Sequence, residues 1–75
     1  MRELVEYLTR ALVSDPDAVV IEEVESGRVV VYEVSVAEED VGKIIGRQGK
    51  VIRAIRSVVK AAATRTGTRV DVDVI

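Results

Sequence analysis

The sequence contains no cysteine and no histidine, and only two of its residues are aromatic, both of them tyrosines. Without cysteine there are no disulfides, and without cysteine or histidine the commonest zinc ligands are missing. Two aromatic side chains are too few for a broad surface on which nucleic-acid bases stack. We therefore predict a chain with no metal and no other cofactor, stabilised by aliphatic packing.

Long apolar runs are missing as well. A helix that spans a membrane needs about 20 consecutive apolar residues, and the apolar runs here are only a few residues long. Residues 1–6 place acids among the apolar positions and do not resemble the apolar core of a signal peptide. We therefore expect a cytoplasmic protein that makes no membrane contact.

The length of 75 residues predicts one domain over residues 1–75, with a core motif at about 28–75 and a helix and strand at 1–27 before it. This length is close to the lower limit at which a single hydrophobic core stabilises a domain unaided. Hydrophobic residues make up 48% of the sequence, which is enough to supply such a core.

The net charge of −2 argues at first sight against a nucleic-acid ligand, but the distribution of charge reverses that argument. Residues 41–70 contain eight lysines and arginines and no acid, whereas residues 1–40 contain three arginines and eleven acids. The local field around a surface, rather than the net charge, attracts a polyanion. We therefore expect the segment 41–70 to carry any nucleic-acid site.

Hydrophobic periodicity and turn residues divide the chain into six elements. The first segment has helical spacing, and Pro16 ends it because the residue before a proline avoids the helical region. The next two segments are rich in β-branched residues, and Ser26 and Gly27 between them predict a hairpin. The predicted order is a helix at 1–14, strands at 18–25 and 28–36, helices at 38–45 and 50–64, and a strand at 69–75.

The alternation of side chains predicts which faces are buried. In the second strand we place Tyr32 and its even-numbered neighbours against the helices, which leaves Val29 and Val31 on the opposite face. The facing of the first strand is ambiguous, because both of its faces mix valine with glutamate. The other residues predicted to point inward are Leu4, Val5, Leu8, Ala11 and Leu12 in the first helix, Val51, Ile55, Val58 and Ala62 in the last helix, with Ile52 and Val59 at its border, and Val70, Val72 and Val74 in the last strand.

A glycine-rich loop, Gly46-Arg47-Gln48-Gly49, precedes the last predicted helix. Glycine adopts positive φ without a Cβ penalty and lets another backbone come close. The start of a helix also attracts phosphate through its free N–H groups. Arg47 and Lys50 add positive charge at the same place, so the loop is a candidate phosphate site.

The helix at 50–64 carries a basic stripe of Lys50, Arg53, Arg56 and Lys60 that begins at this loop. The helical period places the stripe beside the apolar residues of the same helix. Solvated helix faces usually mix both signs of charge for i,i+4 pairing, and this stripe contains no acid. The pattern favours a binding face over an ordinary solvated one.

The string from Ile44 to Ile52, Ile-Ile-Gly-Arg-Gln-Gly-Lys-Val-Ile, resembles the core signature of the KH domain. The predicted α-β-β-α-α-β order resembles the bacterial, type II form of that fold. The likeness covers essentially the whole chain and is greatest to small bacterial single-KH RNA-binding proteins of the KhpA type, whose opening helix is similar to residues 1–8. It implies an α+β fold in which helices pack on one face of a three-stranded mixed sheet. Residues 37–40 depart from the family, where we expect proline or another single helix-opening residue.

The resemblance implies a protein that binds short single-stranded RNA, as an RNA chaperone or post-transcriptional regulator, and that works with a larger KH-containing protein. The small core and the valines at 29 and 31, on the sheet face that the helices leave open, predict a homodimer or such a partner on that face. The loop would hold the RNA backbone while three isoleucines form an apolar floor for the bases. Ile44 and Ile45 have an equal alternative as plain core, and Lys43 as a solvating residue of its own short helix. The predicted RNA-binding residues are Lys43, Ile44, Ile45, Gly46, Arg47, Gln48, Gly49, Lys50, Ile52, Arg53, Arg56 and Lys60.

Two other functions fit the sequence less well. An enzyme is disfavoured because the loop lacks the P-loop spacing and the chain has no histidine or cysteine to act as base or nucleophile. Asp71 and Asp73 could suggest a metal pair, but we interpret them as solvated positions on an edge strand, where charge discourages aggregation. A protein-interaction module with little RNA binding is the main alternative, and Arg47 and Lys50 argue against it.

Overall fold

The computed structural model describes all 75 residues and has the predicted order of elements. Short 3-10 turns at Pro16–Ala18, Glu38–Asp40 and Arg47–Gly49 lie between the main elements. None of the helices is long and apolar enough to cross a membrane. The helices are α1 (Arg2–Leu12), α2 (Val41–Ile45) and α3 (Lys50–Thr64), and the strands are β1 (Val20–Ser26), β2 (Val29–Ser35) and β3 (Arg69–Val74).

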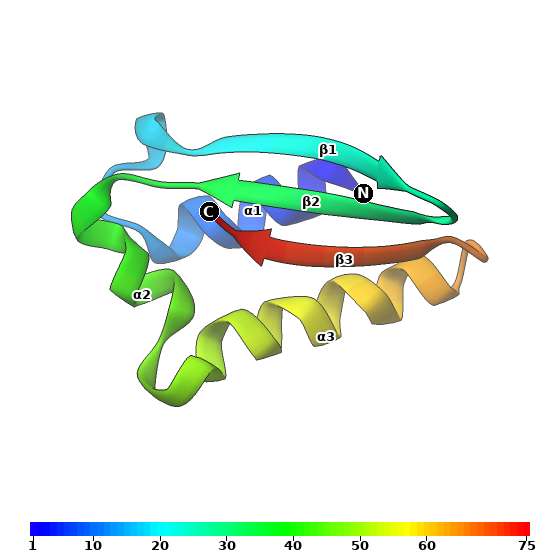
Figure 1. Cartoon of the computed structure of the whole chain (residues 1–75). Helices are drawn as coiled ribbons and strands as arrows, with labels where there is room; N and C mark the ends of the chain where they lie inside the picture. The colour runs from blue at the N-terminus through cyan, green and yellow to red at the C-terminus, as the bar shows by residue number, and fades with distance from the viewer.

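The three strands form one mixed sheet in the order β1-β2-β3. β1 and β2 are an antiparallel hairpin that turns at Gly27, where φ is +63°. β2 and β3 are parallel, with Tyr32 opposite Val72, and α2 and α3 form the crossover between them. All three helices lie on one side of the sheet (Figure 1). The fold is therefore α+β, as predicted, and it is consistent with a KH fold.

The sheet face that contacts the helices contains Ile21, Tyr32, Val34 and Val72, all of which are buried. The cross-strand register places Ile21 opposite Val34, which resolves the facing of β1 that the sequence left open. Burying side chains of this size stabilises the fold by about 1.5–3 kcal/mol each. The opposite face carries Val20 and the other residues that alternate with the buried ones, and no helix covers it.

The buried side of α1 differs from the prediction. Val5 and Thr9 are fully buried, whereas Ala11 and Leu12 are exposed. Hydrophobic periodicity does not predict the burial of Thr9, because threonine is polar. Its hydroxyl donates a hydrogen bond to the Val5 carbonyl at 2.8 Å. With its one donor satisfied inside its own helix, the threonine packs like a small apolar residue.

The buried side of α3 is also rotated from the prediction. Ile52, Ile55, Val59 and Ala63 are buried, while Val58 is 48% exposed. The helix has a wide apolar arc, and it packs chiefly on β3. The sheet therefore covers one part of that arc, and Val58 is left on the remainder.

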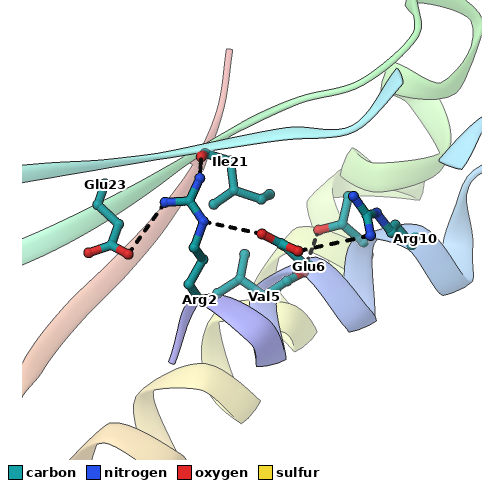
Figure 2. Close-up of polar contacts among 7 residues, drawn as sticks. Arg2, Val5, Glu6, Arg10, Ile21 and Glu23 are labelled. Atoms are coloured by element: carbon teal, nitrogen blue, oxygen red, sulfur yellow. Dashed lines mark hydrogen bonds and ion pairs between the residues drawn. The ribbon is translucent and has the colours of Figure 1, made fainter. Parts of the chain in front are cut away.

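An arginine from a helix covers each edge of the sheet. Arg2 of α1 donates to the carbonyl of Ile21 on β1, and its guanidinium also pairs with Glu6 at 3.2 Å and Glu23 at 3.5 Å (Figure 2). Arg56 of α3 donates to the carbonyl of Val72 on β3 at 2.7 Å. Unpaired edge groups are sites at which sheets associate, and the two arginines occupy one such group on each edge.

Asp40 ties the start of α2 to the end of α1. Its side chain is fully buried, and its carboxylate accepts hydrogen bonds from the Ser14 and Asp15 N–H groups, both at 3.0 Å. The Lys43 ammonium lies 3.3 Å from the same carboxylate. The hydrogen bond from Ser14 is the largest cause that lowers the pKa of Asp40, and Asp15 and Lys43 lower it further against the opposing effect of burial. The acids at 38–40 lie in a first helical turn, and Asp40 among them is buried and fixes α2 to the segment after α1.

Replacing Asp40 by Asn should lower the free energy of unfolding, because an amide nitrogen cannot accept the second N–H. The pKa of Asp40 is lower in the folded chain than its ordinary value, so its contribution is complete above about pH 4 and is lost as the pH falls below that. We expect urea unfolding to separate wild type from Asp40→Asn by a constant amount between pH 5 and 7 and by a shrinking amount below about pH 4. Glu39→Gln, an exposed neighbour, is the control; a pH-independent gap for Asp40→Asn would contradict this account.

Candidate nucleic-acid interface

The loop begins with a close contact between two elements. Gly46 directly follows α2, and its φ of +75° and ψ of 172° fall in a region that only glycine commonly adopts. A Cβ on Gly46 would lie 2.4 Å from Val51 Cγ2 and 2.8 Å from Val51 N. Because one of these atoms is backbone, α3 would have to move to admit any side chain. The first glycine is therefore required for α2 to lie against the start of α3.

The next residues form a tight turn in left-handed geometry. Gln48 has φ 58° and ψ 26°, and Gly49 has φ 73° and ψ 17°. The N–H of Gly49 donates to the Gly46 carbonyl at 3.1 Å, and the N–H of Lys50 donates to the Arg47 carbonyl. The sequence predicted free N–H groups at the start of α3. The N–H of Lys50 is not one of them, because it is already bonded within the loop. No side chain caps α3.

The cations of the loop have no acidic partner. Arg47 and Lys50 are exposed and take part in no ion pair or side-chain hydrogen bond. Arg53, one turn into α3, donates to the Gln48 carbonyl at 2.8 Å and pairs with no acid. Its guanidinium therefore braces the turn while its charge stays uncompensated. These three residues put positive charge around a loop whose Gln48 side chain is exposed.

Arg56 and Lys60, the two later members of the basic stripe, do have acidic partners. Arg56 lies 3.5 Å from Asp71 and 3.7 Å from Asp73, and Lys60 lies 3.8 Å from Asp71. The two aspartates are solvent-exposed positions of the edge strand β3, as interpreted, and they also form a partly exposed ion-pair network with α3. Such pairs contribute little to stability individually, but they neutralise the middle of the stripe.

The predicted apolar floor and Lys43 separate into different roles. Ile44 is fully buried and Ile52 is 8% exposed, so Ile44 belongs to the core and cannot touch a base directly. Ile45 is 39% exposed beside the loop and is the isoleucine accessible to a ligand. Lys43 contacts Asp40 and the Ser14 hydroxyl, which draws it toward the segment after α1 rather than to the loop.

Three residues that shape the site were not predicted to belong to it. Val51 sets the Gly46 contact, Asp40 anchors α2, and Asp71 neutralises part of the stripe. A sequence signal exists only for Asp40, as the one acid of the 38–40 cluster that directly precedes the apolar run of α2. The pairing of Asp71 depends on how α3 lies on the sheet, which the sequence does not give.

A family model and the similar curated proteins point to the same family. Residues 2–74 match the family model described as KhpA/KhpB, KH domain. The proteins named RNA-binding protein KhpA from Caldanaerobacter subterraneus subsp. tengcongensis and from Clostridium acetobutylicum are 47% and 44% identical over 75 residues, each covering the whole of both chains. A KhpA from Halalkalibacterium halodurans is also 47% identical, over 99% of its length.

Among solved structures, the chain resembles part of Aquifex aeolicus Era bound to GDP and aluminium fluoride, with a TM-score of 0.70 and 19% identity. Era in complex with MgGDPNP and nucleotides 1506–1542 of 16S ribosomal RNA gives a TM-score of 0.67 at the same identity. The match covers 96% of this chain but 28% of each Era chain. At this identity the likeness concerns the fold alone.

The loop geometry predicts a graded response to alanine at three glycines. Gly46→Ala should cost about 2–5 kcal/mol of unfolding free energy, from backbone strain and overpacking against Val51. A Cβ added at Gly49 would have no atom within 4 Å, so Gly49→Ala should cost about 1–2 kcal/mol of unfolding free energy from its left-handed backbone alone. Gly42→Ala, in α2 with open space, should be stabilising by about 0.5–1 kcal/mol. Denaturant unfolding measures all three, and equal effects at Gly42 and Gly46 would contradict the close approach.

Proposed function

The chain belongs to the KhpA/KhpB family of KH domains, and we propose that it binds short single-stranded RNA through the loop at 46–49 and the start of α3. The observation that carries this proposal is the state of Arg47 and Lys50. In a chain with more acids than bases, these two residues lie on a glycine loop with no acidic partner. Arg53 adds a third uncompensated cation directly behind them.

The proposed mechanism is binding without chemistry. Gly46 and Gly49 hold a turn that projects the Arg47 and Gln48 side chains into solvent, where they and Lys50 contact phosphates. Phosphate contacts position a strand without selecting its sequence, so base preference has to come from contacts to base edges or shape. Ile45 is the apolar side chain that a base could cover, whereas Ile52 is part of the core. Few contacts and no aromatic stacking make binding by one copy weak.

We further assign the type II form of the KH fold, because a hairpin precedes the two-helix crossover and a single strand follows it. The cellular role consistent with sequence-tolerant binding is that of an RNA chaperone or post-transcriptional regulator. No group of histidine, cysteine, aspartate or glutamate side chains forms a candidate metal site. We propose no enzymatic activity, and the cytoplasmic location stays a prediction.

Replacing Arg47 and Gln48 together by Asp should nearly abolish RNA binding at low salt, because carboxylates would then face phosphate. The fold should survive, since both side chains are exposed and Asp tolerates the left-handed backbone of position 48 better than most residues. Affinity for a short single-stranded RNA is measured by fluorescence anisotropy. Arg10→Asp with Ala11→Asp changes the net charge equally on an exposed part of α1 and should keep binding. Wild-type affinity in the loop variant would falsify the assignment.

A second function, association with another KH protein or with a second copy, is favoured by an apolar groove between α1 and α3. The groove has a volume of about 380 Å³ and six of its seven lining residues are hydrophobic. Leu12 and Val58 within it are 44% and 48% exposed. The sequence predicts such a contact on the open sheet face at Val29 and Val31, but both of these valines are half-buried in the structure. Contiguous exposed apolar surface of this kind commonly marks a contact, so we propose the groove instead.

Val58→Gln should shift the chain toward monomer, because it puts an amide into the apolar groove. Val24→Gln changes a valine of the open sheet face that is 38% exposed, and it should leave association unchanged. Sedimentation equilibrium of the full chain over a range of concentrations measures both. A stronger effect of the Val24 variant would indicate that the contact lies on the open sheet face. A wild-type chain that is monomeric at every concentration would contradict the homodimer.

A further inference from the structure

The cations without an acidic partner form two groups rather than one. Arg2, Arg10, Lys43, Arg56 and Lys60 each lie within ion-pair distance of a carboxylate. The first unpaired group is the loop set described above. The second unpaired group is Arg28, Arg65 and Arg69, which come from two turns far apart in the sequence and make no ion pair or side-chain hydrogen bond.

The second group gathers at the other end of the molecule. Arg28 follows the hairpin turn, and Arg65 and Arg69 flank the turn between α3 and β3. Figure 1 shows the hairpin tip and the α3–β3 turn side by side, at the end opposite the glycine loop. An open recess of about 490 Å³ between them is lined by Arg28, Gly67, Thr68 and Arg69, with no apolar side chain and no acid.

The surroundings of this recess suit an anion. The adjoining recess is lined by two valines and by the polar residues Lys60, Thr64, Thr68, Arg69 and Asp71. That aspartate is already engaged by Arg56 and Lys60, at 3.5 and 3.8 Å. Two guanidinium groups and a threonine hydroxyl can all donate hydrogen bonds to phosphate oxygens. A phosphodiester has the charge and the hydrogen-bond acceptors that match these donors.

We propose that Arg28 and Arg69, with Arg65 beside them, form a second phosphate-binding site that holds the same RNA strand beyond the segment held by the glycine loop. This proposal rests on the RNA binding proposed above and extends it to a longer strand. α3 has 15 residues, which separates the two sites by about 22 Å. A stacked strand rises about 3.4 Å per nucleotide, so about six or seven nucleotides span the gap. The loop of a KH domain holds about four nucleotides, so about ten to twelve nucleotides reach both sites.

The two sites act on one strand as a bivalent contact. Once the loop holds the RNA, the far arginines meet a phosphate at high effective concentration, which raises affinity without any sequence readout. The ion pairs of Arg56 and Lys60 with the β3 aspartates keep the middle of α3 nearly neutral, so the contacts are confined to the two ends. A strand too short to reach the far end should therefore bind through the loop alone.

The test compares oligouridine strands of five and twelve nucleotides, bound to the full chain at several salt concentrations. Each lost phosphate contact flattens the plot of log affinity against log salt by about 0.7 for single strands. Arg28→Gln and Arg69→Gln together should flatten the twelve-nucleotide slope by about 1.4 and leave the five-nucleotide slope unchanged. Each single variant should give about half that change. Arg10→Gln removes the same charge as either single variant, on α1, and should change neither slope.

The outcomes separate this proposal from the function on which it rests. If neither strand binds the wild-type chain, RNA binding itself is wrong. If the five-nucleotide strand binds through the loop but the double variant keeps the wild-type slope on twelve nucleotides, the far arginines do not contact RNA, and a protein partner for them becomes the alternative. An equal effect on both strand lengths also overturns the proposal, because it would report general charge rather than a second site. Circular dichroism confirms that the variants are folded, as expected for exposed and unpaired side chains.

Discussion

Gly46 and Val51 lie so close together that no side chain fits between them, and the position of the loop depends on this contact. The contact holds the last turn of α2 against the first turn of α3, so the chain has only three residues in which to reverse. Two of them, Gln48 and Gly49, take left-handed backbone geometry as a result. The exposed side chains of Arg47 and Gln48 are a consequence of that reversal. Asp40 supports the same arrangement from the other end of α2 by fixing it to the segment after α1.

The distribution of charge becomes specific only in three dimensions. In the sequence, every charged residue of the segment 41–70 is basic. In the folded chain the two aspartates of β3 neutralise Arg56 and Lys60, and Asp40 holds Lys43. The cations that remain free lie at the two ends of α3. Intramolecular ion pairs thus reduce a continuous basic stretch to two separate patches, which favours attachment at defined points over diffuse binding along the helix.

The order and approximate bounds of the six main elements followed from periodicity, proline and glycine, because these signals are local. The α+β class and the mixed sheet followed from that order. The rotation of α3 about its own axis could not be predicted from the sequence. Its apolar arc is wider than the surface that β3 offers, so the periodicity of Val51 and Val58 fits two orientations equally well. Thr9 was missed because its burial depends on a hydrogen bond within α1. Ile44 and Ile45 are adjacent in the same motif, and only packing decides that the first is core and the second is exposed.

The loop at 46–49 and the first turn of α3 form the proposed contact surface for nucleic acid. A titration of the ¹⁵N-labelled full chain with a five-nucleotide single-stranded RNA, followed by amide chemical shifts, tests it most directly. We expect the largest shifts on Gly46–Lys50 and Arg53, while the amides of α1 change little. Shifts concentrated on the open sheet face around Val20 and Val24, with the loop amides unmoved, would contradict it.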